Sequence, residues 1–515
     1  METTSEEHEK SIFDEFIESH PYPVHYVRFT APDDSEEGQK KRKKQFLYYV
    51  SGYAARLIRA ILDKSGFTET KEIDEALLIV GSALEDEKVS TLKVGQKTNH
   101  YMKTFSLGSK EGYHKLMENV TAHTGSRPNY YPESYLIPAE LTELRENFET
   151  SDLWIAKPAG GARGQGIQVV TDIPKLRPGR RMIVQKYIKD PLLINGLKFD
   201  LRFYVAVPSL DPLRVYIFDN GLVRLATLPY KENLEHPEEV AAHLTNFSIN
   251  RDKEGFIATD DVANDGKGNK WSHAPLWPFL ESVGFSSDEI KRKIEDAVTQ
   301  VILAAHSTFK EQKNHRNAFE LFGFDVMIDE NQNISIIEVN VTPALGTSSE
   351  LDRFIKTPLV KDIFNISLIP KTPKLPKVVE NLEKIMRDER KPENEEEKQP
   401  EPASTKPAKG GKNSKNSKGN KNAASTNDEE IENMEEKMKL REFVTVCEFE
   451  LANQRHGGFR CIWPTKERWE EMGDLFEKKS ENDEMLKKWI EFNDDEKKNF
   501  LEERYEDFKN HVSAE

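Results

Sequence analysis

Apolar residues recur along this chain with two different spacings, which predict its helices and strands. A spacing of three to four residues predicts helices over 45–62 and 291–309. Short apolar runs bounded by glycine or proline predict strands. These runs cover 76–81, 154–156, 167–170, 182–188, 199–207, 213–218, 322–328 and 334–339. Helices that alternate with strands predict an α/β or α+β body up to about residue 370.

Three parts of the chain lack this alternation. Residues 1–40 are acidic and poorly patterned, which predicts a mobile tail. An acid-rich run over 388–401 precedes six lysines within 403–426, which favours a disordered charged linker over 373–426. Helical spacing returns over 427–515 and predicts a helical appendix, separate from the α/β body.

The composition excludes several classes of protein. With 74 basic and 90 acidic residues among 515, the net charge of −16 argues against a nucleic-acid binder. Two cysteines, Cys447 and Cys461, cannot form a disulfide framework or a cysteine-rich zinc site, which favours a reducing cytosol. The acidic start lacks a signal-peptide pattern, and no apolar run approaches about 18 residues. We therefore expect a soluble, intracellular protein with no membrane partner.

The sharpest motif is a glycine-rich loop over 157–166, Lys-Pro-Ala-Gly-Gly-Ala-Arg-Gly-Gln-Gly. Its glycines free backbone N–H groups to converge on an anion, and Lys157 and Arg163 add positive charge. The loop lacks the Gly-Lys-Ser/Thr of a Walker A motif, and a strand follows where a dinucleotide fingerprint needs a helix. Two interpretations stay open: a loop that closes a β-hairpin over phosphates, or a plain surface hairpin.

Charged residues also gather on two adjacent predicted strands. Strand alternation places Lys198, Asp200 and Arg202 on one face and apolar residues on the other. Arg224 lies in the next candidate strand. A half-exposed sheet whose charges face water explains each strand alone, whereas two such strands just after the glycine loop favour a ligand site.

A predicted hairpin carries the most specific cluster. If Asn331 and Gln332 form the centre of its turn, Asp325 and Glu338 face each other, with Asn340 on the same side. Two such close carboxylates repel and are costly to desolvate. Carboxylates with a carboxamide suit Mg²⁺ that bridges nucleotide phosphates. A carboxylate pair that shares a proton, or an edge that faces solvent, stays open as an alternative.

Together these clusters resemble the tubulin tyrosine ligase-like family, whose catalytic module has an ATP-grasp-type fold. The resemblance runs from about residue 99 to 368, and its motifs occur in family order. They lie at 157–166, 184–188, 198–202, 222–224, 243–250, 319–325 and 338–340. The segments 99–101, 131–135 and 457–460 are most similar to the polyglutamylase branch. The resemblance implies an N-terminal subdomain over 41–145, a central subdomain with the glycine loop over 146–228, and a C-terminal subdomain with the Mg²⁺ site over 229–372.

The resemblance also implies roles for individual residues. The implied catalytic residues are Lys157, Arg163, Lys198, Arg202, Arg224 and Glu338. The implied ATP contacts are Lys157, Arg163, Gly164, Gln185, Lys186, Tyr187, Ile188, Lys198, Phe199, Asp200, Thr245 and Asn246. The incoming amino acid would meet Arg224, Phe247 and Lys270, and two Mg²⁺ ions would bind Asp325, Glu338 and Asn340.

Two departures from the family pattern bear on the choice of amino acid. The family often has tyrosine where Phe247 stands, and Ser-Pro-Ser where this chain has Thr342-Pro343-Ala344. Both departures remove a hydroxyl group and leave the three metal residues intact.

The function that the resemblance implies is an ATP- and Mg²⁺-dependent polyglutamylase. It would activate a glutamate side chain of an acidic tubulin tail as an acyl phosphate, which the amine of free L-glutamate then attacks. Alternatives are a tubulin glycylase or tyrosine ligase on the same scaffold, or a catalytically silent microtubule-binding relative. We expect a monomer in the cytoplasm, on the cytoskeleton, with cilium, flagellum or basal body as further locations. Three questions stay open: whether the protein initiates or elongates glutamate chains, whether it modifies α- or β-tubulin, and whether it also modifies proteins other than tubulin.

Overall fold

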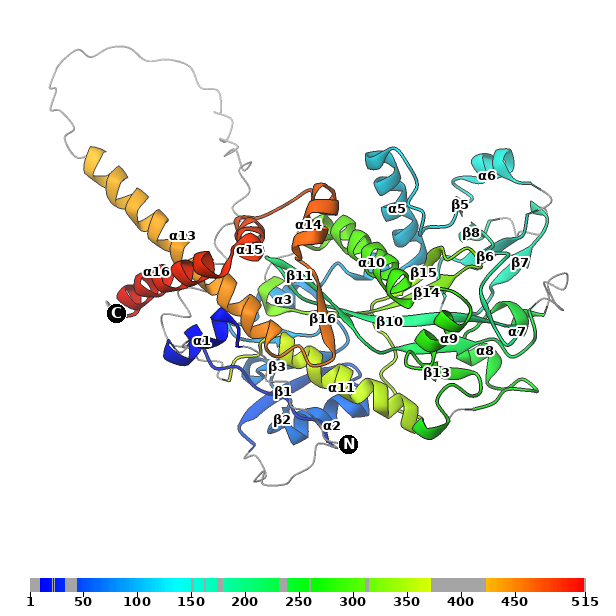
Figure 1. Ribbon diagram of the computed structural model, residues 1–515, viewed down its shortest axis with the longest axis horizontal. Helices are drawn as coiled ribbons and strands as arrows, with labels where there is room; N and C mark the ends of the chain where they lie inside the picture. The colour runs from blue at the N-terminus through cyan, green and yellow to red at the C-terminus, as the bar shows by residue number, and fades with distance from the viewer. Residues whose placement is uncertain are drawn as a thin grey trace, which may run out of the picture. The chain divides into compact units, whose positions relative to one another are not determined.

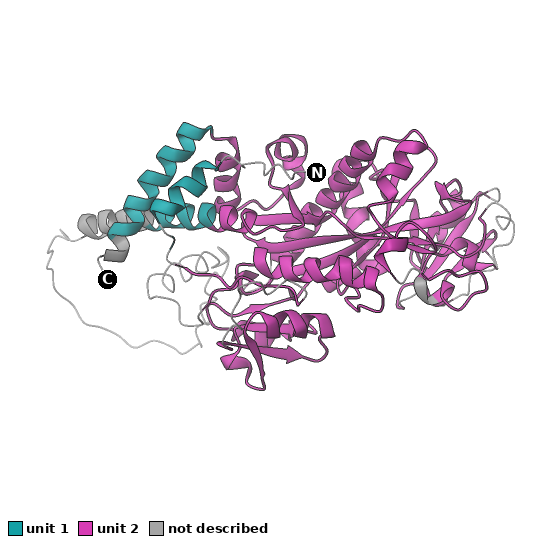
Figure 2. Cartoon of the chain, turned by 60° about the horizontal axis from the view of Figure 1, so that its bottom comes forward, with its two compact units in different colours: residues 1–23, 375–447, 493–515 teal, residues 24–374, 448–492 magenta. Residues whose placement is uncertain are grey.

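The computed structural model describes residues 10–20, 22, 24–32, 44–149, 152–161, 164–173, 179–230, 239–258, 261–310, 315–371 and 423–513. For 247–248, 423–436 and 511–513 it describes the backbone alone. Of the linker predicted over 373–426, residues 373–422 lie outside the described residues. The chain divides into a larger unit, residues 24–374 with 448–492, and a smaller unit, residues 1–23, 375–447 and 493–515 (Figure 2).

The main sheet of the larger unit is built around one long strand, β10 (Leu197–Leu210). Beside it lie β11 (Leu213–Phe218), β12 (Leu222–Leu225) and β14 (Glu320–Ile328), all antiparallel to it (Figure 1). The other strands of this sheet are β9 (Leu193–Ile194), β13 (Lys270–Ser272), β15 (Ile334–Asn340) and β16 (Phe459–Trp463). The predicted strands over 199–207, 213–218, 322–328 and 334–339 are therefore confirmed.

Alternation along β10 gives the main sheet two different faces. Phe199, Leu201 and Phe203 point into the hydrophobic core, where they join residues of helix α10 (Ser287–Lys310), which confirms the helix predicted over 291–309. Lys198, Asp200 and Arg202 point to the opposite face. They are buried as well, so the interpretation in which these charges face water is wrong.

A second, antiparallel sheet carries the glycine-rich loop. Its order is β5 (Ser134–Ile137), β8 (Met182–Lys186), β6 (Trp154–Pro158) and β7 (Gln168–Val170). Because β6 pairs with β7, the loop closes a hairpin, as predicted. The subdomain boundary predicted at 145/146 falls between β5 and β8, although these two strands pair with each other. The subdomain boundary predicted at 228/229 likewise falls between the paired strands β10 and β14.

A third sheet, near the N-terminus, is parallel. Its order is β2 (Phe67–Thr70), β1 (Phe46–Ser51), β3 (Leu78–Gly81) and β4 (Lys97–Thr98). The prediction of one helix over 45–62 is wrong, because β1 precedes helix α2 (Arg56–Lys64). The aromatic and β-branched residues of 46–50 favour a strand, and pairing with β2 and β3 on both sides overrides the helical spacing.

The prediction of a mobile tail over 1–40 is wrong for the described residues 10–20 and 24–32. Helix α1 (Ile12–Ser19), in the smaller unit, begins with a capping box between Ser11 and Asp14. Its Phe16 packs edge-on against Tyr505 of helix α16 (Asp494–Ser513), with ring centroids 5.7 Å apart. In the larger unit, Phe29 packs against Phe364, with centroids 5.0 Å apart. Buried aromatic residues therefore order segments whose average composition is polar.

The helical segment predicted over 427–515 is confirmed, but residues 448–492 are not a separate appendix, because they belong to the larger unit. Strand β16 pairs with β11 and so extends the main sheet. Its Trp463 is fully buried and stacks on Trp469, with ring centroids 4.7 Å apart. Along the chain, β16 follows helix α13 (Ala423–Asn453) and precedes helices α14 (Lys466–Met472) and α15 (Glu481–Glu491).

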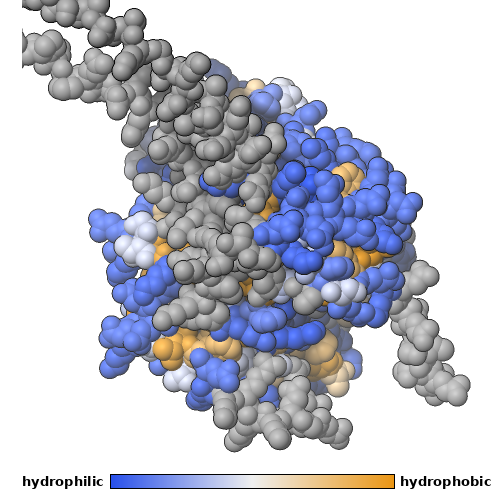
Figure 3. Space-filling model, turned by 90° about the vertical axis from the view of Figure 1, so that its left-hand side faces the viewer, coloured by the Kyte–Doolittle hydropathy of each residue, from blue (hydrophilic) through white to orange (hydrophobic). Residues whose placement is uncertain are grey.

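The other helices complete the described part of the chain. They are α3 (Asp86–Ser90), α4 (Phe105–Gly108), α5 (Lys110–Thr124), α6 (Leu141–Asn147), α7 (Val240–His243), α8 (Phe247–Asn250), α9 (Leu276–Ser282) and α11 (Glu350–Ile366), with short 3-10 turns at Ile73–Glu75, Val262–Asn264, His315–Asn317 and Gly473–Leu475. Within the described residues, no helix combines the length and apolar character needed to cross a membrane. The face shown in Figure 3 is mostly hydrophilic, with small hydrophobic patches between the polar residues.

Candidate nucleotide site

A cavity of about 180 Å³ lies where the antiparallel sheet of the glycine loop meets the charged face of the main sheet. Most of the residues predicted to bind nucleotide or metal line it. They are Lys157, Gly164, Gln185, Lys186, Tyr187, Ile188, Lys198, Asp200, Thr245, Asn246, Asp325, Glu338 and Asn340. Strands β6, β8, β10, β14 and β15 thus bring together residues that are up to 183 positions apart, from Lys157 to Asn340.

Other predicted site residues lie elsewhere. Arg163 is outside the described residues, and so is the side chain of Phe247. Phe199 belongs to the hydrophobic core, because alternation turns its side chain away from the cavity, so its prediction as a nucleotide contact does not fit its position. Arg202 and Arg224 lie behind the cavity wall as partners of Asp325, and Lys270 lies beside Arg224 on the next strand.

Two buried lysines supply positive charge to the cavity. Lys157 donates from Nζ to Oε1 of Gln185 at 2.7 Å, and Gln185 in turn donates to Ser134 at 2.9 Å. Burial lowers the pKa of Lys157 to about 8. Burial, and then repulsion from Lys157, lowers the pKa of Lys198 to about 7. Neither lysine forms an ion pair within the described residues, which makes both available to an anionic ligand.

The carboxylates of the cavity come from the hairpin of β14 and β15. Asp325 faces Glu338 directly, as predicted. The turn differs from the prediction: it is a three-residue loop over 330–332 with Gln332 in the left-handed region (φ 64°), in place of a two-residue turn. A bulge at Ile337 compensates for the extra loop residue and restores the pairing of the two acids.

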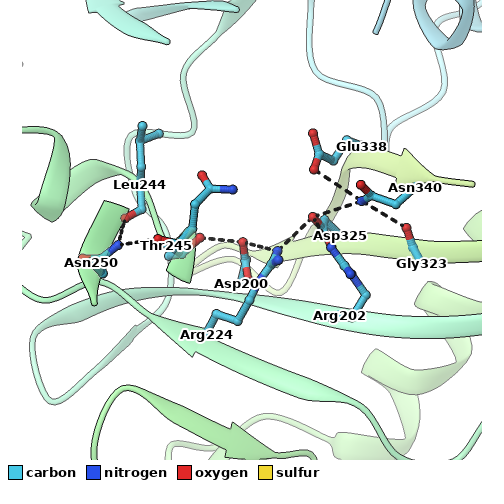
Figure 4. A network of polar contacts seen from close by, with 11 residues as sticks. Asp200, Arg202, Arg224, Leu244, Thr245, Asn250, Gly323, Asp325, Glu338 and Asn340 are labelled. Atoms are coloured by element: carbon cyan, nitrogen blue, oxygen red, sulfur yellow. Dashed lines mark hydrogen bonds and ion pairs between the residues drawn. The ribbon is translucent and has the colours of Figure 1, made fainter. Parts of the chain in front are cut away.

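Asn340 joins these two carboxylates. Its Nδ2 lies 3.3 Å from Oε1 of Glu338 and 3.5 Å from Oδ2 of Asp325 (Figure 4). Burial, and then the neighbouring charge of Asp325, raises the pKa of Glu338. The nearest cation to Glu338 is Lys110, with its Nζ 3.9 Å from Oε2. A buried carboxylate that is so weakly compensated would be stabilised by a cation.

Asp325 is part of a chain of alternating charges that runs along the floor of the site (Figure 4). Arg202 donates to Asp325 at 2.5 and 3.0 Å, and Nη2 of Arg224 lies 2.9 Å from Oδ2 of Asp325. Arg224 also grips Asp200 at 2.6 and 2.7 Å, and Thr245 donates to Asp200 at 2.5 Å. Although burial opposes ionisation, the two guanidinium groups hold the pKa of Asp325 well below its usual range.

The donor set fits Mg²⁺. In the described part of the chain, no group of three or more His, Cys, Asp or Glu side chains could hold a metal ion. Asp325, Glu338 and Asn340 offer two carboxylates and a carboxamide, and Mg²⁺ in nucleotide sites takes few protein ligands besides phosphate oxygens and water. The raised pKa of Glu338 marks the ligand that would gain most from a bound cation.

Sequence reasoning missed Lys110 as a residue of this cavity. Lys110 is the first residue of α5, and its Nζ donates to the carbonyl oxygen of Gly161 at 3.1 Å. It thereby connects the glycine loop with Glu338. Ser109, which caps α5, shows where the helix begins, but no local pattern connects Lys110 to a loop that follows about 50 residues later.

Beside Arg224, a second polar cluster surrounds Asp352. Lys270 and Lys356 each hold Asp352 at 2.7 Å, and Lys270 pairs with Arg224 across β12 and β13. Arg224 uses Nε and Nη2 for Asp200 and Asp325, whereas its Nη1 makes no hydrogen bond within the described residues. The two N–H groups of Nη1 therefore remain available.

Comparisons with known proteins identify the family of this chain. The chain belongs to the tubulin-tyrosine ligase family, whose model matches residues 87–376. It is 34% identical over 339 residues to "Tubulin monoglutamylase TTLL4" of Homo sapiens, which covers 64% of this chain and 28% of the relative. It is 33% identical over 321 residues to "Tubulin polyglutamylase ttll-4" of Caenorhabditis briggsae, with 60% and 52% covered. "Tubulin polyglutamylase TTLL6" of Mus musculus is 31% identical over 340 residues, with 64% and 41% covered. The matched part thus spans between about a quarter and a half of the length of these relatives.

Proposed function

We propose that this chain is an ATP- and Mg²⁺-dependent tubulin polyglutamylase, which joins L-glutamate to glutamate side chains in tubulin tails. The observation that carries the proposal is the cavity in which buried Lys157 and Lys198 face Asp325, Glu338 and Asn340. The names of the relatives, tubulin mono- and polyglutamylases, support this substrate and amino acid.

In this proposal each part of the cavity has a role. Lys157, Lys198 and Arg163 hold the phosphates, and the segment Gln185–Ile188 lines the adenine pocket. Mg²⁺, held by Asp325, Glu338 and Asn340, would neutralise phosphate charge when bound. These cations would stabilise the negative charge that develops when a carboxylate oxygen takes the γ-phosphoryl group and when the amine then displaces phosphate.

Arg224 and Lys270 are proposed to bind the incoming amino acid. The Nη1 edge of Arg224, with its two N–H groups, suits a carboxylate oxygen, because hydrogen bonds between charged donors and acceptors are strong. Two acids already hold the same guanidinium in place, which fixes its orientation without using that edge. Lys270 is held by Asp352 at 2.7 Å and would add a second cation beside it.

The proposal also covers partners and location. Microtubules, through their acidic tails, would be the macromolecular partner, and free L-glutamate the small substrate. The protein would act as a monomer on the cytoskeleton, including that of a cilium, flagellum or basal body.

The test is to incubate purified protein with tubulin, ATP and Mg²⁺, and with glutamate, glycine or tyrosine in separate reactions. Mass spectrometry of the tubulin tails should detect added glutamate alone. Added glycine or tyrosine would replace the proposal by one of these alternatives. Microtubule binding without any addition would identify a catalytically silent relative.

A further inference from the structure

Behind the proposed phosphate site, three buried polar groups form a row: Lys198, Tyr187 and His243. Nζ of Lys198 donates to the hydroxyl oxygen of Tyr187 at 2.8 Å. The same hydroxyl lies 2.9 Å from Nδ1 of His243. The three residues are 4%, 6% and 2% exposed, so water hardly competes for these contacts. His243 also lines the cavity and was not among the residues predicted from the sequence.

The chemistry of the three groups fixes the direction of the first hydrogen bond and guides the assignment of the second. An ammonium group only donates, so the oxygen of Tyr187 accepts from Lys198. Burial raises the pKa of Tyr187 well above its usual value, so the phenol keeps its proton. We assign Nδ1 of His243, at 2.9 Å, as the acceptor of that proton, which gives a neutral ring with its proton on Nε2.

Aromatic packing holds the row in place. Tyr187 stacks on Tyr230, with centroids 6.5 Å apart and planes at 19°, and both rings meet His243 edge-on at 5.7 and 5.9 Å. Nζ of Lys198 lies 4.1 Å from the centroid of Tyr187. The hydroxyl of Tyr230 donates to the carbonyl of Lys189 at 2.8 Å, which anchors the outer ring.

We propose that His243 is a positioning residue that fixes Lys198 for the nucleotide phosphates, and that it acts through the hydroxyl of Tyr187. When Nδ1 of His243 accepts a hydrogen bond from the hydroxyl of Tyr187, the oxygen of Tyr187 becomes a better acceptor for the ammonium group of Lys198, since successive hydrogen bonds polarise one another. This inference rests on the nucleotide-binding part of the proposed function and on nothing that concerns tubulin or glutamate.

A double-mutant cycle tests whether His243 acts through Tyr187. Titration calorimetry would give the Kd of ATP, with Mg²⁺ present, for the wild type, His243→Leu, Tyr187→Phe and the double variant. Each single variant should raise the Kd about tenfold, because a hydrogen bond to a charged group is weakened or lost. The double variant should match the single variants within about twofold, because either change breaks the same row.

Two further variants separate positioning from simple packing. His243→Asn places an amide oxygen near the position of Nδ1 and should restore the Kd to within about twofold of the wild type. His114→Leu is the matched control, because His114 is another buried histidine, with its Nδ1 2.9 Å from the hydroxyl of Tyr131, and it does not contact Lys198. Its loss should leave the Kd unchanged, whatever it does to thermal stability.

The outcomes distinguish this inference from the proposed function. Additive effects of His243→Leu and Tyr187→Phe, or no rescue by His243→Asn, would overturn the positioning role. If the protein binds ATP with the expected coupling but adds no glutamate to tubulin, the proposed function fails while the role of His243 stands.

Discussion

The two buried lysines of the cavity should make nucleotide binding depend on pH. Their pKa values lie at about 7 for Lys198 and about 8 for Lys157, both lowered by burial. A lysine is cationic below its pKa, so the charge that attracts phosphate is lost as the pH rises through this range. The Kd of ATP, measured by calorimetry from pH 6.5 to 9, should therefore increase with pH. At pH 8, binding should take up protons from the buffer, and a Kd that stays constant over this range would contradict this role of the lysines.

The Glu338→Gln variant should nearly abolish ligation and leave the fold intact. Glutamine keeps the shape of the side chain but removes one negative ligand for Mg²⁺. Because burial and the charge of Asp325 both raise the pKa of Glu338, its ionised form is unfavourable in the folded protein. The melting temperature of the variant should therefore be equal to or higher than that of the wild type. Glutamate incorporation above a few per cent of wild type would contradict the metal assignment.

The Arg224→Lys variant should impair the use of glutamate more than the use of ATP. Lysine keeps the charge but cannot hold Asp200 and Asp325 and still offer a free edge, as the guanidinium of Arg224 does. The KM for glutamate should rise about tenfold or more, since a hydrogen bond to a charged group contributes about 1.5–3 kcal/mol. Steady-state kinetics with each substrate varied in turn would measure this. A larger change in the KM for ATP would make Arg224 a nucleotide residue.

At the scale of single elements, alternation and glycine punctuation predicted β10, β11, β14 and β15 of the main sheet and β6, β7 and β8 of the sheet that carries the glycine loop. They also predicted that Asp325 faces Glu338, although for a partly wrong reason. The two-residue turn assumed from the sequence is a three-residue loop, and the bulge at Ile337 cancels the difference. A turn and a bulge that compensate each other leave the pairing of the acids unchanged, so the sequence pattern could not distinguish the two cases.

Elements whose structure depends on distant partners were not predictable in this way. The apolar residues of 45–62 fit a helical spacing, yet the first part pairs as strand β1 between β2 and β3. Strand β16 is five residues long and stands between helices, so only its pairing with β11, about 240 positions earlier, reveals it. Lys110 and His243 were missed as site residues for the same reason, because their partners lie far away in the sequence.

Replacement of Trp463 should show that β16 belongs to the larger unit. Trp463 is fully buried in the hydrophobic core that also contains β10 and α10. Trp463→Ala should lower the free energy of unfolding by about 3–5 kcal/mol, because it leaves a large cavity. Urea unfolding followed by circular dichroism would measure the change. Glu467→Ala, at an exposed position nearby, is the control and should stay within about 0.5 kcal/mol of wild type.

At the scale of the whole molecule, charge opposes the proposed partner. A chain with a net charge of −16 must approach tubulin tails that are also acidic. The residues 403–422, outside the described part, contain six lysines and no acidic residue. Replacing these lysines with serine should weaken microtubule co-sedimentation and flatten its salt dependence, since exposed charges are screened over about 8–10 Å. Turnover on a short glutamate-rich peptide should change far less.

Equal microtubule binding by this lysine-free variant and the wild type at low salt would leave 403–422 as a spacer. The attraction to microtubules would then have to come from residues 427–515 or from the surface around the cavity.

The late position of β16 has a consequence for how the protein is made. The strands that carry the site end at Asn340, but β16, which covers the outer edge of β11, begins only at Phe459. A ribosome that adds about 5–20 residues per second needs roughly 10 s to make the chain between them. Throughout that time the edge of β11 has no strand beside it, and unpaired edges are places where chains aggregate. The nascent chain therefore passes through a stage in which its site residues are complete while its main sheet is still unfinished, and faster synthesis would shorten that stage.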